Sequence, residues 1–202
     1  MKNTILSGAV VLASLAASGV STDSWAQPAP GMRGINHIGI TVPDMDQAVT
    51  FFRDILGCQK AMSFGPFRDD EGTFIQDLLN VHPRAVVNQI TMMRCGNGSN
   101  IEIFDYSSPD QKDAIPRNSD IGGHHIGFYF DDIAAVKAYF DDKGIRTLLG
   151  PLPVQEGPAA GQTILYFFAP WGLQLEAISF PDGMAYEADS DTILWSSRDP
   201  SK

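Results

Sequence analysis

Residues 35–42 (INHIGITV) alternate between large apolar side chains and small or polar ones. This two-residue period predicts a β-strand that buries Ile38, Ile40 and Val42 on one face and turns His37 to the other. Asp44 or Asp46 is expected to cap a following helix, because apolar residues recur at helical spacing between 48 and 56 before Gly57.

The same pattern returns 88 residues later. Residues 123–130 (GHHIGFYF) alternate in the same way, Asp131-Asp132 precede a second apolar helix, and His37 aligns with His125 without a gap. A strand–helix unit repeated in this way indicates a duplicated module.

The strands that follow the helices repeat as well. Residues 99–106 match residues 172–180, which places Glu102 opposite Glu176 in the alignment. Each of the two is preceded by one further strand, at 86–95 in the first half, and Gly96-Asn97-Gly98 predicts a tight hairpin. The sequence therefore predicts an α+β protein built from two βαβββ modules.

The domain boundaries follow from this repeat. We expect a signal peptide at 1–26, a linker at 27–34, one domain at 35–180 and a tail at 181–202. The domain holds modules at 35–106 and 121–180, and the first module carries an insertion at 64–84 with helical spacing around 74–79. A lid over a substrate and a surface elaboration are both consistent with this insertion.

The expected signal peptide begins with Lys2 and an apolar run from Ile5 to Val20, and Ser24-Trp25-Ala26 offers small residues where a signal peptidase cleaves. The run is short for a membrane anchor. We therefore expect a periplasmic or secreted protein with no membrane segment after cleavage. Export would permit a disulfide between Cys58 and Cys95, but the spacing leaves their pairing open.

The charge balance excludes one class of partner. The 202 residues carry a formal net charge of -10, whereas nucleic-acid binding needs clustered Lys and Arg. A hydrophobic content of 44% is typical of a globular protein. The partner we expect, on the grounds of the candidate metal site and the family resemblance given below, is a small-molecule substrate.

Strand alternation turns four ionisable residues away from the helices. His37, Glu102, His125 and Glu176 all lie on the face opposite their buried neighbours. Two imidazoles and two carboxylates suit one divalent transition metal (Zn, Ni, Co, Mn or Fe) better than Mg or Ca. His124 and His82 are the competing histidines. We expect His124 to face the helix side and His82 to lie on the surface.

The chain resembles the vicinal oxygen chelate superfamily of glyoxalases, epimerases, extradiol dioxygenases and drug-resistance proteins. The resemblance rests on INHIGITVPDMDQAVTFFRDILG at 35–57, IEIFDYSSP at 101–109, GHHIGFYFDDIAAVKAYFDDKGI at 123–145 and LQLEAISF at 173–180. It implies a glyoxalase-like fold in which paired modules form a curled mixed sheet around a metal cleft, often in a homodimer. It also implies that the four matching residues are the metal ligands.

The resemblance leaves three functions open. A glyoxalase-like lyase or isomerase would chelate vicinal substrate oxygens and use Glu102 or Glu176 as the catalytic base. An extradiol-type dioxygenase would hold Fe(II) with His37, His125 and Glu176, and Phe104, Tyr106 and Tyr129 would suit a phenolic substrate. A metal-free binding protein, or an inactive relative that kept the site, is the third alternative.

Overall fold

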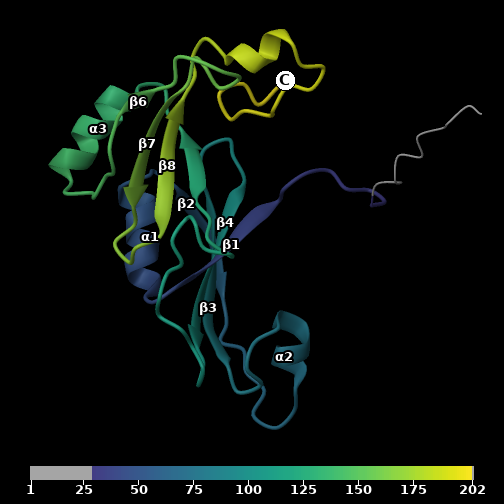
Figure 1. The fold of residues 1–202 in the computed structure, drawn as a ribbon. Coiled ribbons are helices and arrows are strands. Elements are labelled where there is room, and N and C mark those ends of the chain that lie inside the picture. Colours follow the sequence, from purple (N-terminus) through teal and green to yellow (C-terminus); the bar gives the residue numbers. More distant parts are fainter. Residues whose placement is uncertain (1–28, 202) are drawn as a thin grey trace, which may run out of the picture. The chain divides into compact units, whose positions relative to one another are not determined.

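The structure is a computed structural model that describes residues 29–201 (Figure 1). The expected signal peptide at 1–26 lies outside the described residues. The chain divides after Gly34, and the residues from Ile35 onward form one compact unit. Every element below belongs to that unit.

The first half of the unit has the predicted element order, and its insertion contains the short helix that the spacing around 74–79 predicted. Its elements are β1 (His37–Val42), α1 (Met45–Asp54), β2 (Gln59–Phe64), α2 (Phe74–Leu79), β3 (Val86–Arg94) and β4 (Asn100–Ser107). The second half contains β5 (Ile126–Tyr129), α3 (Ile133–Asp142), β6 (Leu152–Pro153), β7 (Thr163–Phe168), β8 (Gln174–Ser179) and a 3-10 turn, η1 (Ala185–Ala188).

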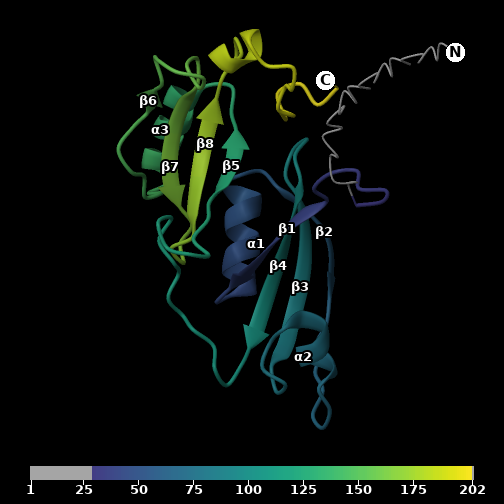
Figure 2. The same ribbon diagram turned by 45° about the vertical axis from the view of Figure 1, so that its right-hand side comes forward.

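Each half forms its own four-stranded mixed sheet, with strand orders β1-β4-β3-β2 and β5-β8-β7-β6 (Figure 2). The first strand of each module runs parallel to the last one, and the other neighbours are antiparallel. This arrangement confirms the predicted α+β fold of two βαβββ modules, and neither sheet closes into a barrel.

The two long helices begin at equivalent aspartates. The side chain of Asp44 accepts a hydrogen bond from the Gln47 backbone N–H at 2.8 Å, and Asp132 accepts one from Ala135 at 3.0 Å. Of the two predicted caps for the first helix, Asp44 is thus the one used. Such caps satisfy a backbone donor that the helix leaves free, which is worth about 1 kcal/mol.

The core runs through both halves as one cluster. Phe52 on α1 and Phe140 on α3 occupy equivalent positions and are both fully buried. Trp171, in the loop before β8, packs against Phe51 of α1 with ring centroids 5.7 Å apart. The hydroxyl of Tyr139 donates to the Asp54 carbonyl oxygen at 3.2 Å, so polar and apolar contacts both join the modules.

The second module departs from the prediction at its first strand. A strand over 123–130 was expected, but β5 covers only Ile126–Tyr129. The backbone N–H of Gly123 donates to the Asp120 carbonyl oxygen at 2.7 Å, which commits it to a turn. Residue 123 thus belongs to the turn, and His124 and His125 lie between that turn and the start of β5 at Ile126.

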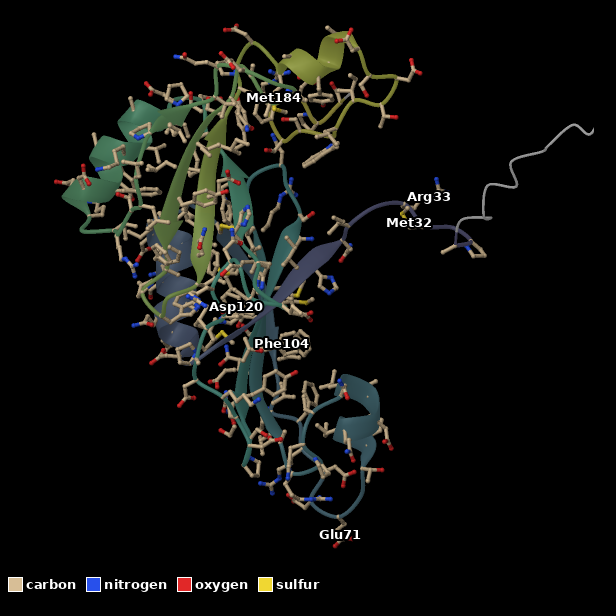
Figure 3. All side chains as sticks on the ribbon, in the orientation of Figure 1. Met32, Arg33, Glu71, Phe104, Asp120 and Met184 are labelled. Atoms are coloured by element: carbon tan, nitrogen blue, oxygen red, sulfur yellow. A yellow bond between two sulfur atoms is a disulfide. The ribbon has the colours of Figure 1, made fainter. Side chains whose placement is uncertain are left out.

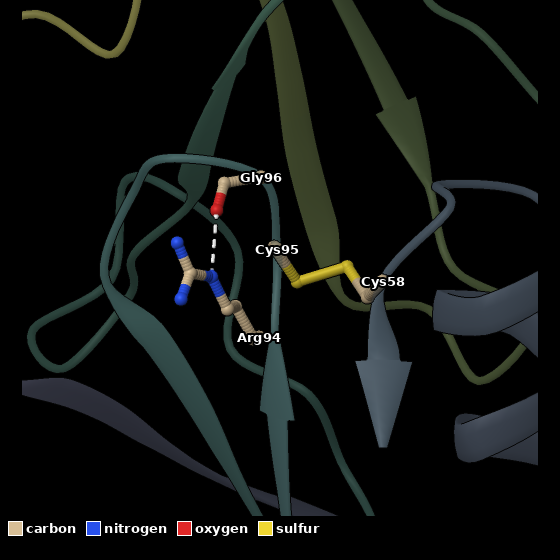
Figure 4. The surroundings of a disulfide bond; sticks show 4 residues. All are labelled: Cys58, Arg94, Cys95 and Gly96. Atoms are coloured by element: carbon tan, nitrogen blue, oxygen red, sulfur yellow. Dashed lines mark hydrogen bonds between the residues drawn. A yellow bond between two sulfur atoms is a disulfide. The ribbon is translucent and has the colours of Figure 1, made fainter. Parts of the chain in front are cut away.

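The two cysteines are bonded to each other. A disulfide joins Cys58 to Cys95, just before β2 and just after β3 (Figure 4). Gln59 pairs with Arg94 in the antiparallel ladder, so the bridge closes the end of the β2–β3 pair. The sequence had left this pairing open.

The insertion is held together by hydrogen bonds among its own residues. Arg84 donates to the carbonyl oxygens of Asp69 and Gly72, and the carboxylate of Asp69 accepts three backbone N–H bonds. Those backbone bonds lower the pKa of Asp69. Within residues 29–201, no helix combines the length and apolar character needed to span a bilayer.

Candidate metal centre

The first pair of site residues lies on neighbouring parallel strands. His37 opens β1, and Glu102 lies on β4 opposite Gly39. The Nε2 atom of His37 is 3.1 Å from Oε2 of Glu102. Ile101 and Ile103, which flank Glu102, are buried on the other face, as strand alternation predicted.

The second pair repeats this geometry. Glu176 on β8 lies opposite Gly127 of β5, and the Nε2 atom of His125 is 3.3 Å from its Oε2. Glycine at positions 39 and 127 keeps the space beside each carboxylate open. A Cβ atom at Gly127 would lie 3.4 Å from Oε2 of Glu176, and one at Gly39 would lie 3.8 Å from Oε2 of Glu102.

Both histidines have an asparagine on their second ring nitrogen. Nδ1 of His37 is 2.9 Å from Oδ1 of Asn36, and Nδ1 of His125 is 3.0 Å from Oδ1 of Asn118. An amide oxygen only accepts hydrogen bonds, so it selects the tautomer with the proton on Nδ1. Each Nε2 then presents a lone pair toward a carboxylate, which is how metal-binding histidines are usually held.

The residues of each pair fit one cation. The approach of each Nε2 to a carboxylate oxygen is favourable when a positive charge lies between them, which either a proton on Nε2 or a bound cation can supply. Two ligands at right angles and about 2.1 Å from the same metal lie about 3.0 Å apart. The two measured separations of 3.1 and 3.3 Å match that spacing.

The structure does not bring the four predicted residues together within one chain. His37 meets Glu102, and His125 meets Glu176, but no group of three or more His, Cys, Asp or Glu side chains among residues 29–201 is arranged to hold a metal. Within the described residues the four predicted ligands therefore form two separate pairs, and one metal held by all four stays a prediction. The physical reason is that each pair belongs to a different sheet, and strand alternation does not fix how two sheets pack.

The two glutamates differ in their surroundings. Tyr166 on β7 lies directly across from Glu176, whereas Met92 on β3 takes the equivalent place opposite Glu102. Burial raises the pKa of the Glu176 carboxyl, although the nearby His125 and a hydrogen bond from Tyr166 act against this rise. Burial and the Glu176 charge likewise raise the pKa of the Tyr166 hydroxyl.

Sequence reasoning missed three polar neighbours of the site, namely Asn36, Asn118 and Tyr166. Asn36 adjoins His37 in the chain and could have been noticed. Pairing β7 with β8 as a hairpin would have placed Tyr166 opposite Glu176. Asn118 lies seven residues before His125 in an irregular loop and gave no periodic signal.

The remaining predicted histidines and aromatic residues lie as follows. His124 is exposed and its Nδ1 lies 3.2 Å from the Gly122 carbonyl oxygen, so it does not face the helix side as expected. Nδ1 of His82 accepts from the Arg84 backbone at 3.0 Å. Phe104, labelled in Figure 3, stacks on Tyr106 with centroids 5.3 Å apart.

Two βαβββ modules with a repeated His–Glu pair define a vicinal-oxygen-chelate type of protein. Comparison with known families agrees: residues 36–168 match the model of the glyoxalase/bleomycin resistance protein/dioxygenase superfamily. The chain belongs to that superfamily. It is also 38% identical, over 82% of its length and 90% of the relative's, to a 2-epi-5-epi-valiolone epimerase from Actinomyces sp.

Solved structures support the same fold. A glyoxalase family protein from Bacillus cereus covers 77% of this chain and 98% of its own, with a TM-score of 0.57 at 18% identity. A glyoxylase/bleomycin resistance protein/dioxygenase domain from Frankia sp. EAN1pec covers 74% of this chain and 98% of its own, with a TM-score of 0.50 at 17% identity. At these identities the likeness establishes the architecture.

Proposed function

We propose that this protein is a divalent-metal-dependent isomerase that moves a proton on the carbon beside a carbonyl group of a small substrate with two vicinal oxygens. The observation that carries the proposal is the repeated His–Glu pair, in which Asn36 and Asn118 leave each Nε2 free to bind a cation. The epimerase among its relatives supports proton transfer over ring cleavage.

We further propose that two copies of the chain complete the metal centre. One copy supplies His37 and Glu102, and the other supplies His125 and Glu176. The face that carries Glu102 is suited to a partner, because Met62 and Met92 share it and lie side by side across β2 and β3. Met62 and Phe64 are 55% and 40% exposed in the single chain, and such an apolar face is typical of an interface.

The chemistry divides between the cation and the side chains. A divalent cation bound by the four residues would act as a Lewis acid on two adjacent substrate oxygens. Glu176 then accepts the proton from the neighbouring carbon, whose electron pair passes into conjugation with the carbonyl. A protonated Glu102 gives its proton to the opposite face of that carbon, which inverts the configuration with no net oxidation. Glu176 then loses its proton to water and Glu102 regains one, which restores the starting state.

Glu176 suits the role of the first base because of its neighbours. Its side chain is 12% exposed, against 19% for Glu102, and only Glu176 has a tyrosine directly across the ladder. A buried carboxylate is a stronger base than a solvated one. The Tyr166 hydroxyl keeps the carboxylate oriented and can stabilise its charged form by hydrogen bonding.

We also propose that the protein acts after export, in the periplasm or outside the cell, once residues 1–26 are removed. The Cys58–Cys95 bond supports this compartment, because disulfides persist in oxidising surroundings.

Subunit complementation tests the shared metal centre. One variant carries His37→Ala with Glu102→Ala, the other carries His125→Ala with Glu176→Ala, and both are co-expressed and purified together. Random pairing makes half of the dimers mixed, and each mixed dimer holds one intact site of two. We expect no tightly bound metal in either variant alone and about a quarter of the wild-type metal content in the mixture.

Two other arrangements of the metal site would give different metal contents in this experiment. A site formed within one chain would leave the mixture without metal. Independent binding at each pair would leave every sample with about half of the wild-type content. Elemental analysis separates these results, and circular dichroism with gel filtration shows that each variant is folded.

Proton exchange tests the reaction itself. The metal-loaded protein is incubated in D2O with 2-hydroxyacetophenone, which has a carbonyl beside a hydroxyl group. We expect deuterium at the carbon next to the carbonyl by NMR, lost in Glu176→Gln and kept in Glu156→Gln, an exposed glutamate outside the site. Oxygen uptake on catechols without any exchange would favour the dioxygenase instead.

A further inference from the structure

A large apolar pocket lies between the second sheet and the C-terminal tail, with a volume of about 850 Å³. Ligand pockets for small molecules fall in this size range. Its floor comes from β5 and β8, and its roof comes from the residues that follow η1. The apolar side chains that line it include Tyr129, Ile178, Phe180, Met184, Leu194 and Trp195.

The pocket adjoins the second His–Glu pair. Gly127 lines the pocket and also lies directly across the ladder from Glu176. Tyr129 and Ile178 follow Gly127 and Glu176 by two residues, so they share the face of the sheet that carries the carboxylate. A substrate that reaches Glu176 therefore has this apolar space beside it.

The tail is held in place over the pocket at several points. Arg198 donates to the carbonyl oxygens of Phe180 (2.5 Å) and Pro181 (3.0 Å), and its guanidinium lies 5.3 Å from the Phe180 ring centroid. The Leu194 backbone N–H donates to the Tyr186 hydroxyl at 2.9 Å. These bonds keep Leu194 and Trp195 above the sheet, although their side chains are 64% and 55% exposed. Figure 3 labels Met184 where this segment begins.

The charged side chains in the wall are already engaged. Arg198 is bound to the two carbonyl oxygens, and the carboxylate of Glu187 accepts from the Met184 backbone N–H at 2.9 Å. A polyhydroxylated or highly charged ligand would have to give up water for a mainly apolar lining. An aromatic or cyclic alkyl group would gain by being buried there.

We propose that the segment 184–199 closes a substrate pocket beside Glu176 and that the substrate carries an aromatic or cyclic alkyl group next to its two chelating oxygens. This inference rests on the proposed metal-dependent function, and it names the class of substrate. A substrate of this class differs from a polyol, which carries hydroxyl groups over its whole surface and has no apolar ring to bury.

A pair of hydroxamates tests the inference. Both acetohydroxamate and benzohydroxamate offer two adjacent oxygens to a metal, but only the second carries a phenyl group. With metal-loaded protein we expect benzohydroxamate to bind at least about tenfold more tightly, because the ring buries further apolar area. Isothermal titration calorimetry gives both dissociation constants. The ratio is expected to fall toward one in Leu194→Asp or Trp195→Ala.

Leu149→Asp is the matched control, since Leu149 is 90% exposed on the same module and does not line the pocket. The control should keep the wild-type ratio. Equal affinities for the two hydroxamates in metal-loaded wild-type protein would overturn the inference, and so would an unchanged ratio in Leu194→Asp and Trp195→Ala.

A metal-free probe separates the two proposals. The fluorescence of 8-anilinonaphthalene-1-sulfonate rises in apolar pockets without any metal. If the protein binds no metal, the proposed function fails, and the pocket is judged on this probe alone. Binding lost in Leu194→Asp and kept in Leu149→Asp would still support the pocket, whereas equal binding in both variants would contradict it.

Discussion

Removing the disulfide between Cys58 and Cys95 is expected to lower the free energy of unfolding by about 4 kcal/mol. The bridge joins residues 37 positions apart, and the loop it closes contains β2, the insertion with α2, and β3. Closing a loop of this length removes roughly 13 cal/mol/K of entropy from the unfolded chain, or about 4 kcal/mol at 25 °C. The change should appear mainly through the unfolded state, since the β2–β3 ladder remains paired without it.

Urea unfolding followed by circular dichroism measures the effect. The oxidised protein, the same protein after reduction and the double variant Cys58→Ala with Cys95→Ala are compared. With a urea dependence of about 2 kcal/mol per molar, the midpoint should fall by about 2 M. Reducing agent should not alter the double variant, which serves as the control.

A loss below about 1 kcal/mol on reduction would refute the reasoning, because the loop-closure argument would then have the wrong size. A second outcome would be a large loss of unfolding free energy in the double variant and none in the reduced wild-type protein. Cys58 is fully buried, so the cavity left by its substitution would then be the cause.

Two further predictions concern the site. In metal-free protein, burial raises the pKa of Glu176 above its ordinary value of 4.5, so ionising this carboxyl costs stability as the pH rises through the folded pKa. Glu176→Gln should therefore unfold at a higher urea concentration than wild type near pH 8. Near pH 3, where both side chains are neutral, the two proteins should unfold at the same concentration. A lower unfolding midpoint for Glu176→Gln at pH 8 would contradict the assigned cause, and Glu156→Gln is the control. Gly127→Val should weaken metal binding more than Gly39→Val, because the added Cβ lies 3.4 Å from Glu176 Oε2 against 3.8 Å from Glu102 Oε2. Competition with a chelating dye measures both affinities, and wild-type affinity in Gly127→Val would show that the space beside Glu176 is not needed.

Much of the local structure followed from short-range patterns in the chain. The two-residue period at 35–42 placed His37 on the face away from the helix. The polar residues before each apolar helical run limited the first cap to Asp44 or Asp46 and placed the start of the second helix at Asp131-Asp132. The 88-residue repeat predicted the βαβββ order of both modules and the equivalence of Glu102 with Glu176. Such features depend on backbone geometry over a few residues, so the amino-acid order carries them directly.

The arrangement of the chemistry depended on contacts between distant residues. Which histidine meets which glutamate follows from β1 pairing with β4 and β5 with β8, and the separation of the two pairs follows from how the sheets and Trp171 pack. Tyr166 and Asn118 reach the site through a hairpin register and an irregular loop. The periodicity of the sequence does not predict these pairings and contacts, because the packing between sheets is a sum of many long-range contacts. Only the folded chain therefore shows two His–Glu pairs and, beside one of them, an apolar pocket under the tail.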